Sequence, residues 1–178
     1  MYVIFVLQVP LKERRNMRIL KRIRNWLPDP DIHRYHIVVS AIIFDDRGNV
    51  LVMERDPDDP GASIFEVPGG GIDPLELTRD AVAREVDEET GLKVSFHETF
   101  FEGAPTQIRR FPFTEYRRVF NFVGSVEGVK PKVRLESGAH VDCQWVPKHK
   151  IRSSGLPDYK LRYVEKAYAI FYNPHPMN

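Results

Sequence analysis

The chain carries, at residues 68–92, the run Pro68-Gly69-Gly70-Gly71-Ile72-Asp73-Pro74-Leu75-Glu76, then eight further residues, then Glu85-Val86-Asp87-Glu88-Glu89-Thr90-Gly91-Leu92. A glycine-rich turn is therefore followed by a segment with helical spacing. Its apolar residues recur on one side of a 3.6-residue period (Ala81, Val82, Val86), which is typical of an amphipathic helix packed on a core.

Both ends of this helix have sequence signals. Thr78 precedes the periodic segment, and we expect its hydroxyl to cap the first turn. Gly91 follows the segment, where a helix commonly ends on a residue in the left-handed conformation. The sequence therefore predicts a helix over residues 79–90.

Three carboxylates lie together on this helix. Glu85, Glu88 and Glu89 stand at positions i, i+3 and i+4, where like charges cost about 0.2–0.5 kcal/mol per pair. Such a cluster is either a solvated acidic face or the site of a compensating cation. Carboxylate oxygens without neighbouring histidine or cysteine favour a hard ion such as Mg²⁺ or Mn²⁺ over zinc.

The complete spacing favours the cation. It is Gly70, five residues, Glu76, seven residues, Arg84-Glu85, an apolar residue, any residue, Glu88-Glu89, any residue, Gly91 and an apolar residue. Seven fixed residues would coincide at a given start with a probability on the order of 10⁻⁸. This pattern is the Nudix box, and the chain resembles the Nudix hydrolase family. The pattern does not fix the residue before Glu76, but relatives often carry glycine there, whereas this chain has Leu75.

The resemblance implies an α/β (α+β) fold, a mixed β-sheet sandwiched between helices. It implies a catalytic set of Glu85, Arg84, Glu88 and Glu89, with Mg²⁺ (or Mn²⁺) bound by Glu85, Glu88, Glu89 and the Gly69 carbonyl. Glu76 and Gly70 would support that site. Arg84 would orient the glutamates through its planar fork, and Glu85 is the candidate base for the attacking water.

The remaining elements can be placed from their apolar patterns. A buried strand over 37–44, a tight turn over 45–49 and a returning strand over 50–54 predict a hairpin, which leads through a proline-rich loop to a short strand at 64–67. Strands are also expected at 92–102, 117–123 and up to Val146, with residues 103–114 as a loop. A final helix, capped by Asp158, is expected to cover one face of the sheet.

Several residues are candidates for substrate binding. The segment 103–116 combines phosphate-binding and stacking side chains and is expected to form a wall of the pocket: Arg109, Arg110, Phe111, Phe113 and Tyr116. Arg55 is a further candidate. Phe65 stands where relatives often carry tryptophan. Glu136 is the nearest replacement for an acidic residue that often precedes the histidine equivalent to His140, because Ala139 occupies that position.

The 178 residues are expected to form one Nudix domain over 36–173, with a basic arm at 1–35 and a tail at 174–178. Residues 1–36 hold eight basic and three acidic residues, and an apolar stripe between Ile19 and Leu27 predicts a basic amphipathic helix. That helix would pack on the domain or pair two subunits into a homodimer. Contact with an anionic membrane and an organelle address are the alternatives.

The first apolar run, residues 2–7, is too short for the core of a signal peptide and no positive charge precedes it. We therefore expect a cytoplasmic protein, with organelle targeting by the arm left open. No segment approaches the length of a membrane span. The domain after the arm is slightly acidic, so no nucleic-acid polymer is expected as a partner.

The expected substrate is a small-molecule diphosphate. The first hypothesis is hydrolysis of the diphosphate linkage in a nucleoside diphosphate derivative. Hydrolysis of a non-nucleotide diphosphate, such as an isoprenyl diphosphate, is the alternative, because the eight aromatic residues between Phe96 and Phe122 suit a purine or a prenyl chain equally. A catalytically silent binding module is the third hypothesis, and the intact carboxylate set argues against it.

Overall fold

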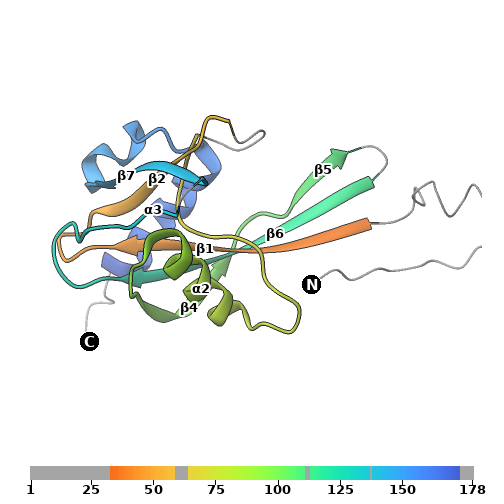
Figure 1. Cartoon of the computed structure of the whole chain (residues 1–178), viewed down its shortest axis with the longest axis horizontal. Helices are drawn as coiled ribbons and strands as arrows, with labels where there is room; N and C mark the ends of the chain where they lie inside the picture. The colour runs from red at the N-terminus through yellow and green to blue at the C-terminus, as the bar shows by residue number, and fades with distance from the viewer. Residues whose placement is uncertain (1–32, 59–63, 111–112, 137, 173–178) are drawn as a thin grey trace, which may run out of the picture.

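The structure is a computed structural model that describes residues 33–58, 64–110, 113–136 and 138–172 (Figure 1). Seven strands, two α-helices and one 3₁₀ helix follow one another in the described part of the chain. They are β1 (His33–Phe44), β2 (Val50–Arg55), β3 (Phe65–Glu66), α2 (Thr78–Thr90), β4 (Ser95–Glu102), β5 (Thr106–Arg110), β6 (Phe113–Ser125), β7 (His140–Val146), η2 (Lys148–Ser153) and α3 (Asp158–Tyr172).

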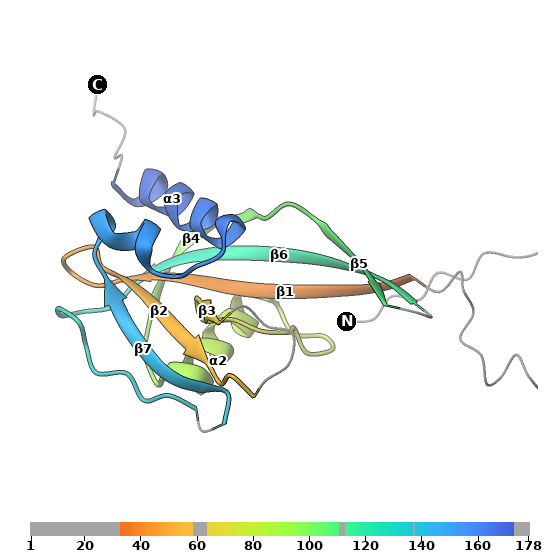
Figure 2. The same ribbon diagram turned by 90° about the horizontal axis from the view of Figure 1, so that it is seen from above.

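The strands form one mixed sheet with helices on both faces, as expected. Its order is β3-β2-β1-β6-β4, with β5 paired to β6 and β7 paired to β2. Figure 2 shows α2 on one face and α3 with η2 on the other. Each face has its own apolar core. One contains Val82 and Val86 of α2, and the other contains Val164 and Tyr168 of α3.

β1 and β6 form the long central pair of the sheet. They run parallel and in register from His33↔Thr114 to Phe44↔Ser125. β1 therefore begins at His33, earlier than its apolar pattern predicts, because pairing with β6 rather than burial defines its first residues. The turn after Phe44 is as predicted, with the Asp45 N–H donating to the Asn49 carbonyl at 3.0 Å.

β1 and β2 are neighbours only at the turn that joins them, where Phe44 pairs with Val50. Beyond that pair β2 turns away toward β3 and β7, as Figure 2 shows. Residues 68–71 lie beside β1 where β2 has turned away, and Gly71 forms an isolated antiparallel bridge with Val38. The divergence of two strands therefore makes room for the glycine loop.

The predicted helix is confirmed as α2, but its predicted cap is wrong. Leu77 is the N-cap residue, and no side chain makes a capping hydrogen bond there. Thr78 is already the first helical residue, which removes its hydroxyl from the capping position. Gly91 ends the helix as expected, with φ 65° and its N–H bonded to the Asp87 carbonyl.

The structure explains why Leu75 is unusual. Its φ is 69°, in the left-handed region, and its side chain is 97% exposed. Glycine adopts this conformation without strain, and a leucine does not. The position therefore suits glycine for a reason of backbone geometry.

The expectation of a loop over residues 103–114 is wrong. Residues 106–110 form β5, which pairs antiparallel with β6 from Thr106↔Arg117 to Arg110↔Phe113. Thr106 and Gln107 are exposed, so this strand has no apolar alternation in its sequence. It is formed by main-chain pairing with β6, which the local pattern could not indicate.

The final helix is confirmed as α3. Asp158, which was expected to cap it, is already its first helical residue, and the Pro157 carbonyl accepts hydrogen bonds from the N–H groups of Lys160 and Leu161. The predicted amphipathic helix between Ile19 and Leu27 lies outside the described residues. Among the helices that the structure describes, none has the length and apolar character needed to cross a membrane.

Candidate active site

The glycine loop is held against β1 by main-chain hydrogen bonds. Val39 N–H donates to the Gly70 carbonyl at 2.9 Å, and Ala41 N–H donates to the Pro68 carbonyl at 2.7 Å. Gly69 has φ 150°, and a Cβ on it would overlap the Val39 carbonyl oxygen. A side chain at Gly69 would therefore push the loop away from the strand.

The loop in turn positions Glu89 of α2. The Gly69 N–H donates to Glu89 Oε2 at 2.8 Å, and the residue is buried. Burial raises the pKa of Glu89 to about 7, and the charges of Glu66 and Glu85 act in the same direction, against the Gly69 hydrogen bond and His140. Without a cation, this carboxylate is therefore partly protonated at neutral pH.

Glu85 lies one turn earlier on the same face of the helix. A Cβ on Gly70 would overlap its carboxylate, so this glycine leaves room for the acid group. Burial raises the pKa of Glu85 above its ordinary value, although Arg84 beside it acts in the opposite direction. Glu85 and Glu89 are thus two crowded carboxylates that favour an added positive charge.

Arg84 connects the loop to the helix. Its Nε and Nη2 donate to the two oxygens of Glu76 at 2.9 Å, and its Nη1 donates to Glu85 and Glu88 at 3.0 Å. Nη2 also donates to the Gly71 carbonyl at 3.0 Å. The hydrogen bonds from Arg84 lower the pKa of Glu76 to about 2, so Glu76 stays ionised and keeps the guanidinium in place.

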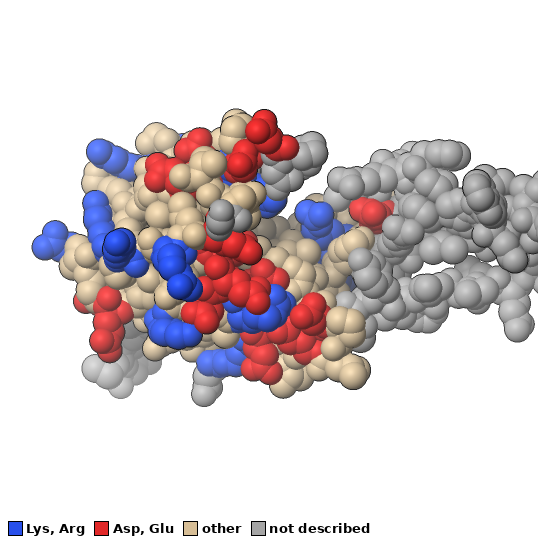
Figure 3. All heavy atoms as spheres, in the orientation of Figure 1, with Lys and Arg blue, Asp and Glu red and all other residues tan. Residues whose placement is uncertain are grey.

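The donor set suits a hard divalent cation. Figure 3 shows acidic side chains gathered over α2 and the loop before it. As the side chains stand, Arg84 holds Glu85 and Glu88, and no three His, Cys, Asp or Glu groups of the described residues converge at ligand distance. Oxygen-only donors nevertheless suit Mg²⁺ or Mn²⁺, and a bound cation would offset the burial and like charges that raise the pKa values of Glu85 and Glu89.

The predicted substrate-binding residues are spread over the domain. Arg55 ends β2 and donates to Glu66 at 2.9 Å. Phe65 packs against the core on the α3 side, where its ring lies against Gly155. Glu136 is exposed, and its N–H donates to the Glu89 carbonyl at 3.1 Å. Its main chain therefore supports the end of α2.

The candidates from 103–116 lie on the β5–β6 hairpin. Arg109 and Arg110 belong to β5, and Phe113 and Tyr116 belong to β6. Phe111 lies outside the described residues. Gly70 is opposite Val39, which pairs with Phe120. Tyr116 is four residues from Phe120, ~13 Å along the strand, and Phe113 is ~23 Å away.

Sequence reasoning missed a second cluster beside the glycine loop. Glu66 of β3 accepts hydrogen bonds from Arg55 and Lys160 at 2.9 Å, and His140 Nε2 lies 3.0 Å from its Oε1. The four residues come from β2, β3, β7 and α3. The available signal was a single carboxylate, Glu66, in an otherwise apolar stretch immediately before the glycine loop.

The ionisation of Glu66 predicts an acid-dependent loss of stability. Burial alone would raise the pKa of Glu66, but the His140 hydrogen bond and the charges of Lys160 and Arg55 lower it to about 2. Because the folded pKa lies below the ordinary glutamate pKa of 4.5, the stabilisation is complete above about pH 4.5 and disappears as the pH falls toward 2. Its size is about 3 kcal/mol.

We therefore expect Glu66→Gln to lower the free energy of unfolding by about 3 kcal/mol at pH 7 and by progressively less below pH 4.5. Urea unfolding of both proteins between pH 2 and 7 measures this difference. Asp87→Asn is the control, because Asp87 makes an exposed ion pair with Lys93, which contributes little. A gap between Glu66→Gln and the parent that stays constant over the whole pH range would contradict the assignment.

Comparison with known proteins identifies the same family as the Nudix box. A family model described as NUDIX domain matches residues 34–166. The chain is 38% identical over 61 residues to the CTP pyrophosphohydrolase of Escherichia coli (strain K12), a match that spans 34% of this chain and 44% of that relative.

Two solved structures have the same fold. The MutT protein from Methanosarcina mazei Go1 aligns with a TM-score of 0.58 and 28% identity, over 75% of this chain and 92% of that one. The solution structure of the E. coli ORF135 protein aligns with a TM-score of 0.55 and 22% identity, over 81% of this chain and 95% of that one. The second likeness concerns the fold alone.

Proposed function

The chain belongs to the NUDIX family and is a Nudix hydrolase, and from this premise we propose that it cleaves the diphosphate linkage of a nucleoside diphosphate derivative with the help of a divalent cation. The observation that carries the proposal is the contact of the glycine loop with two crowded carboxylates. Gly69 binds Glu89 and Gly70 leaves room for Glu85. The curated relative acts on CTP, which favours a nucleotide over a prenyl diphosphate.

The residues have distinct roles in this proposal. Glu85, Glu88 and Glu89, with the Gly69 carbonyl, would hold Mg²⁺ or Mn²⁺. A bound cation would neutralise the charge that builds on the phosphate oxygens during cleavage. Arg84 and Glu76 hold Glu85 and Glu88 in position. The raised pKa of Glu85 makes it a suitable acceptor for the proton of the attacking water.

A phosphate-release screen tests the proposal. Nucleoside triphosphates, nucleotide sugars, dinucleotides and isoprenyl diphosphates are incubated with the full chain and Mg²⁺ or Mn²⁺. We expect turnover of nucleotide substrates and none of the prenyl compounds. Turnover of prenyl diphosphates alone would favour the non-nucleotide alternative. Good metal binding without any turnover would favour a silent binding module.

We further propose that the β5–β6 hairpin forms a wall of the substrate pocket. Because the hairpin leads away from the glycine loop, the contribution of its side chains should fall toward the tip. Tyr116→Ala is expected to raise KM more than Phe113→Ala, with kcat nearly unchanged, which indicates binding shared by ground and transition states.

The alternative is that these rings only pack. A buried aromatic costs about 3–5 kcal/mol when replaced by alanine. A large fall in melting temperature with an unchanged KM would therefore remove the hairpin from the pocket. KM and melting temperature are to be measured on the same variants, with Phe100→Ala in the adjacent β4 as a control for loss of an aromatic ring.

A further inference from the structure

Two leucines before α2 occupy positions that their local backbone does not favour. Leu75 has φ 69°, where glycine or asparagine is preferred. Leu77 is the N-cap residue of α2, where a side chain that accepts a hydrogen bond from the first turn is preferred. An asparagine would suit both positions. Two neighbouring residues that both lower the local stability indicate a role outside the loop itself.

The same two leucines, called the leucine pair below, are exposed on a loop that is held in place. Leu75 is 97% and Leu77 is 70% exposed, so neither belongs to an apolar core. Glu76 stands between them, and its carboxylate accepts hydrogen bonds at 2.9 Å from Arg84 and from the Asp73 N–H. The loop therefore presents two apolar side chains to solvent from an anchored backbone.

The leucine pair has acidic neighbours. The side chain of Asp73 is 75% exposed, and Asp80 is exposed in the first turn of α2. Figure 3 shows further acidic side chains over this helix. A negative potential favours a partner that combines apolar with basic residues, and it repels an anionic lipid surface. Two leucines are also far smaller than a standard protein interface, which buries about 800 Å² on each partner.

The chain itself contains a segment with the required chemistry. Residues 18–27 hold five apolar and four basic residues and no acidic one. The apolar residues are Ile19, Leu20, Ile23, Trp26 and Leu27, and the basic residues are Arg18, Lys21, Arg22 and Arg24. Their spacing predicts an apolar stripe opposite a basic face. This combination is complementary to two leucines with acidic neighbours.

The segment is attached close to the leucine pair. Its last residue precedes His33, the first residue of β1, by six positions, which is at most ~22 Å of chain. The loop that carries the leucine pair leaves β1 at the bridge between Gly71 and Val38 and extends beside the first half of that strand (Figures 1 and 2). A short connection within one molecule gives an effective concentration in the mM range, so a small surface is sufficient for docking.

We propose that residues 18–27 dock on the leucine pair of the same molecule, with their apolar side on the two leucines and their basic side toward the acidic neighbours. This interaction surface goes beyond the proposed function and does not depend on turnover. Glu76 of the same loop holds Arg84. The docked segment therefore lies beside the catalytic carboxylates without contributing to them.

Tryptophan fluorescence tests the docking in the full chain. Trp26 and Trp145 are its two tryptophans, so Trp145→Phe leaves Trp26 as the single probe. We expect acrylamide to quench Trp26 weakly in this protein. In Leu75→Asn/Leu77→Asn on the same background, the quenching constant should rise several-fold, to that of a free tryptophan derivative. The melting temperature should not fall, because asparagine suits both the left-handed conformation and the N-cap position.

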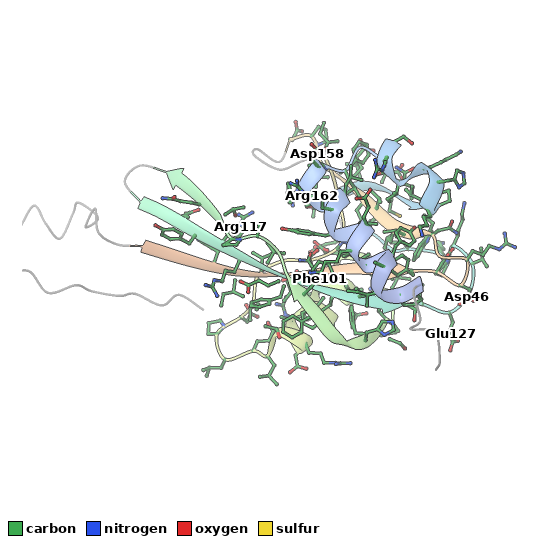
Figure 4. All side chains as sticks on the ribbon, turned by 180° about the vertical axis from the view of Figure 1, so that it is seen from behind. Asp46, Phe101, Arg117, Glu127, Asp158 and Arg162 are labelled. Carbon is green, nitrogen blue, oxygen red and sulfur yellow. The ribbon has the colours of Figure 1, made fainter. Side chains whose placement is uncertain are left out.

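Ile170→Asn is the matched control, because Ile170 is also an exposed aliphatic residue, at 41%. It lies on α3, which Figure 4 shows on the face of the sheet turned away from α2, with Asp158 and Arg162 marking its first turns. Its replacement should leave the quenching of Trp26 unchanged. The docking would be overturned by equal quenching before and after the leucine substitutions, or by an equal rise for Ile170→Asn.

Disulfide formation locates the contact without the tryptophan probe. Cys143→Ser removes the single cysteine of the chain. On that background, Ile23→Cys combined with Leu75→Cys should form a disulfide under mild oxidation, and the product should migrate as a monomer on a non-reducing gel. Ile23→Cys combined with Ile170→Cys should not. Equal yields for the two combinations would overturn the docking site. A product of dimer size would overturn docking within one molecule and would place the segment on a second copy.

Discussion

Replacing Glu89 by glutamine is expected to lower kcat at least about 10²-fold, the range for a lost electrostatic contribution to the transition state, and also to stabilise the metal-free protein at pH 8. Activity falls because glutamine provides no charge for the cation. Stability rises because burial has raised the pKa of Glu89 to about 7, so the ionised form is disfavoured in the folded chain.

The raised pKa of Glu89 also determines how the stability difference between the two proteins depends on pH. The folded pKa of about 7 lies above the ordinary glutamate pKa of 4.5, so ionised Glu89 destabilises the fold increasingly as the pH rises from about 4.5 to above 7. The full difference is at most about 3 kcal/mol. Glutamine keeps an oxygen that can accept the Gly69 N–H. Urea unfolding in a chelator at pH 4 and pH 8 should therefore separate the two proteins only at pH 8.

Glu88→Gln is the matched control. Glu88 stands one residue earlier with its side chain 53% exposed, so its replacement should reduce kcat to a similar extent without a gain in stability at pH 8. Near-normal activity of either variant at saturating Mg²⁺ would remove that residue from the mechanism. Equal unfolding free energies of Glu89→Gln and the parent at pH 8 would contradict the burial argument.

Replacing Arg84 by lysine is expected to reduce kcat/KM by about 10²-fold, although the charge is kept. The guanidinium binds Glu76, Glu85, Glu88 and the Gly71 carbonyl at once. An ammonium is a compact charge without the planar fork, so it cannot satisfy this arrangement. Without these bonds the carboxylates would shift from their positions, and in a catalytic site a shift of about 1 Å can lower the rate about 10²-fold.

Arg79→Lys gives the comparison. Arg79 lies on the same helix, is exposed, and makes one side-chain hydrogen bond, to the Phe96 carbonyl at 3.0 Å. A lysine can make the same bond, so kcat/KM should stay within about threefold of the parent. Steady-state kinetics with a saturating Mg²⁺ series should also show a higher Mg²⁺ requirement for Arg84→Lys. Activity of Arg84→Lys equal to that of Arg79→Lys would show that the fork is unnecessary.

The local sequence was sufficient for the helix that carries the carboxylates and for the first two strands with the turn between them, but not for the cap of that helix. The spacing of Glu85, Glu88 and Glu89 placed three carboxylates on one helix, and Gly91 marked its end. The apolar runs before and after the tight turn at residues 45–49 predicted β1 and β2. Helical spacing and tight turns involve contacts within a few residues, and for this reason their patterns are visible in the sequence.

The tertiary structure decided what depends on distant residues. β5 exists because β6 provides a partner for a segment that begins with the exposed polar residues Thr106 and Gln107. The N-cap residue of α2 is Leu77, because the loop keeps an extended backbone up to Leu77 and Thr78 is the first helical residue. The cluster of Glu66, His140 and Lys160 joins residues up to 94 positions apart. The sequence marks only Glu66, as a lone carboxylate in an apolar stretch, and the folding of β3, β7 and α3 onto one another brings the three residues together beside the glycine loop.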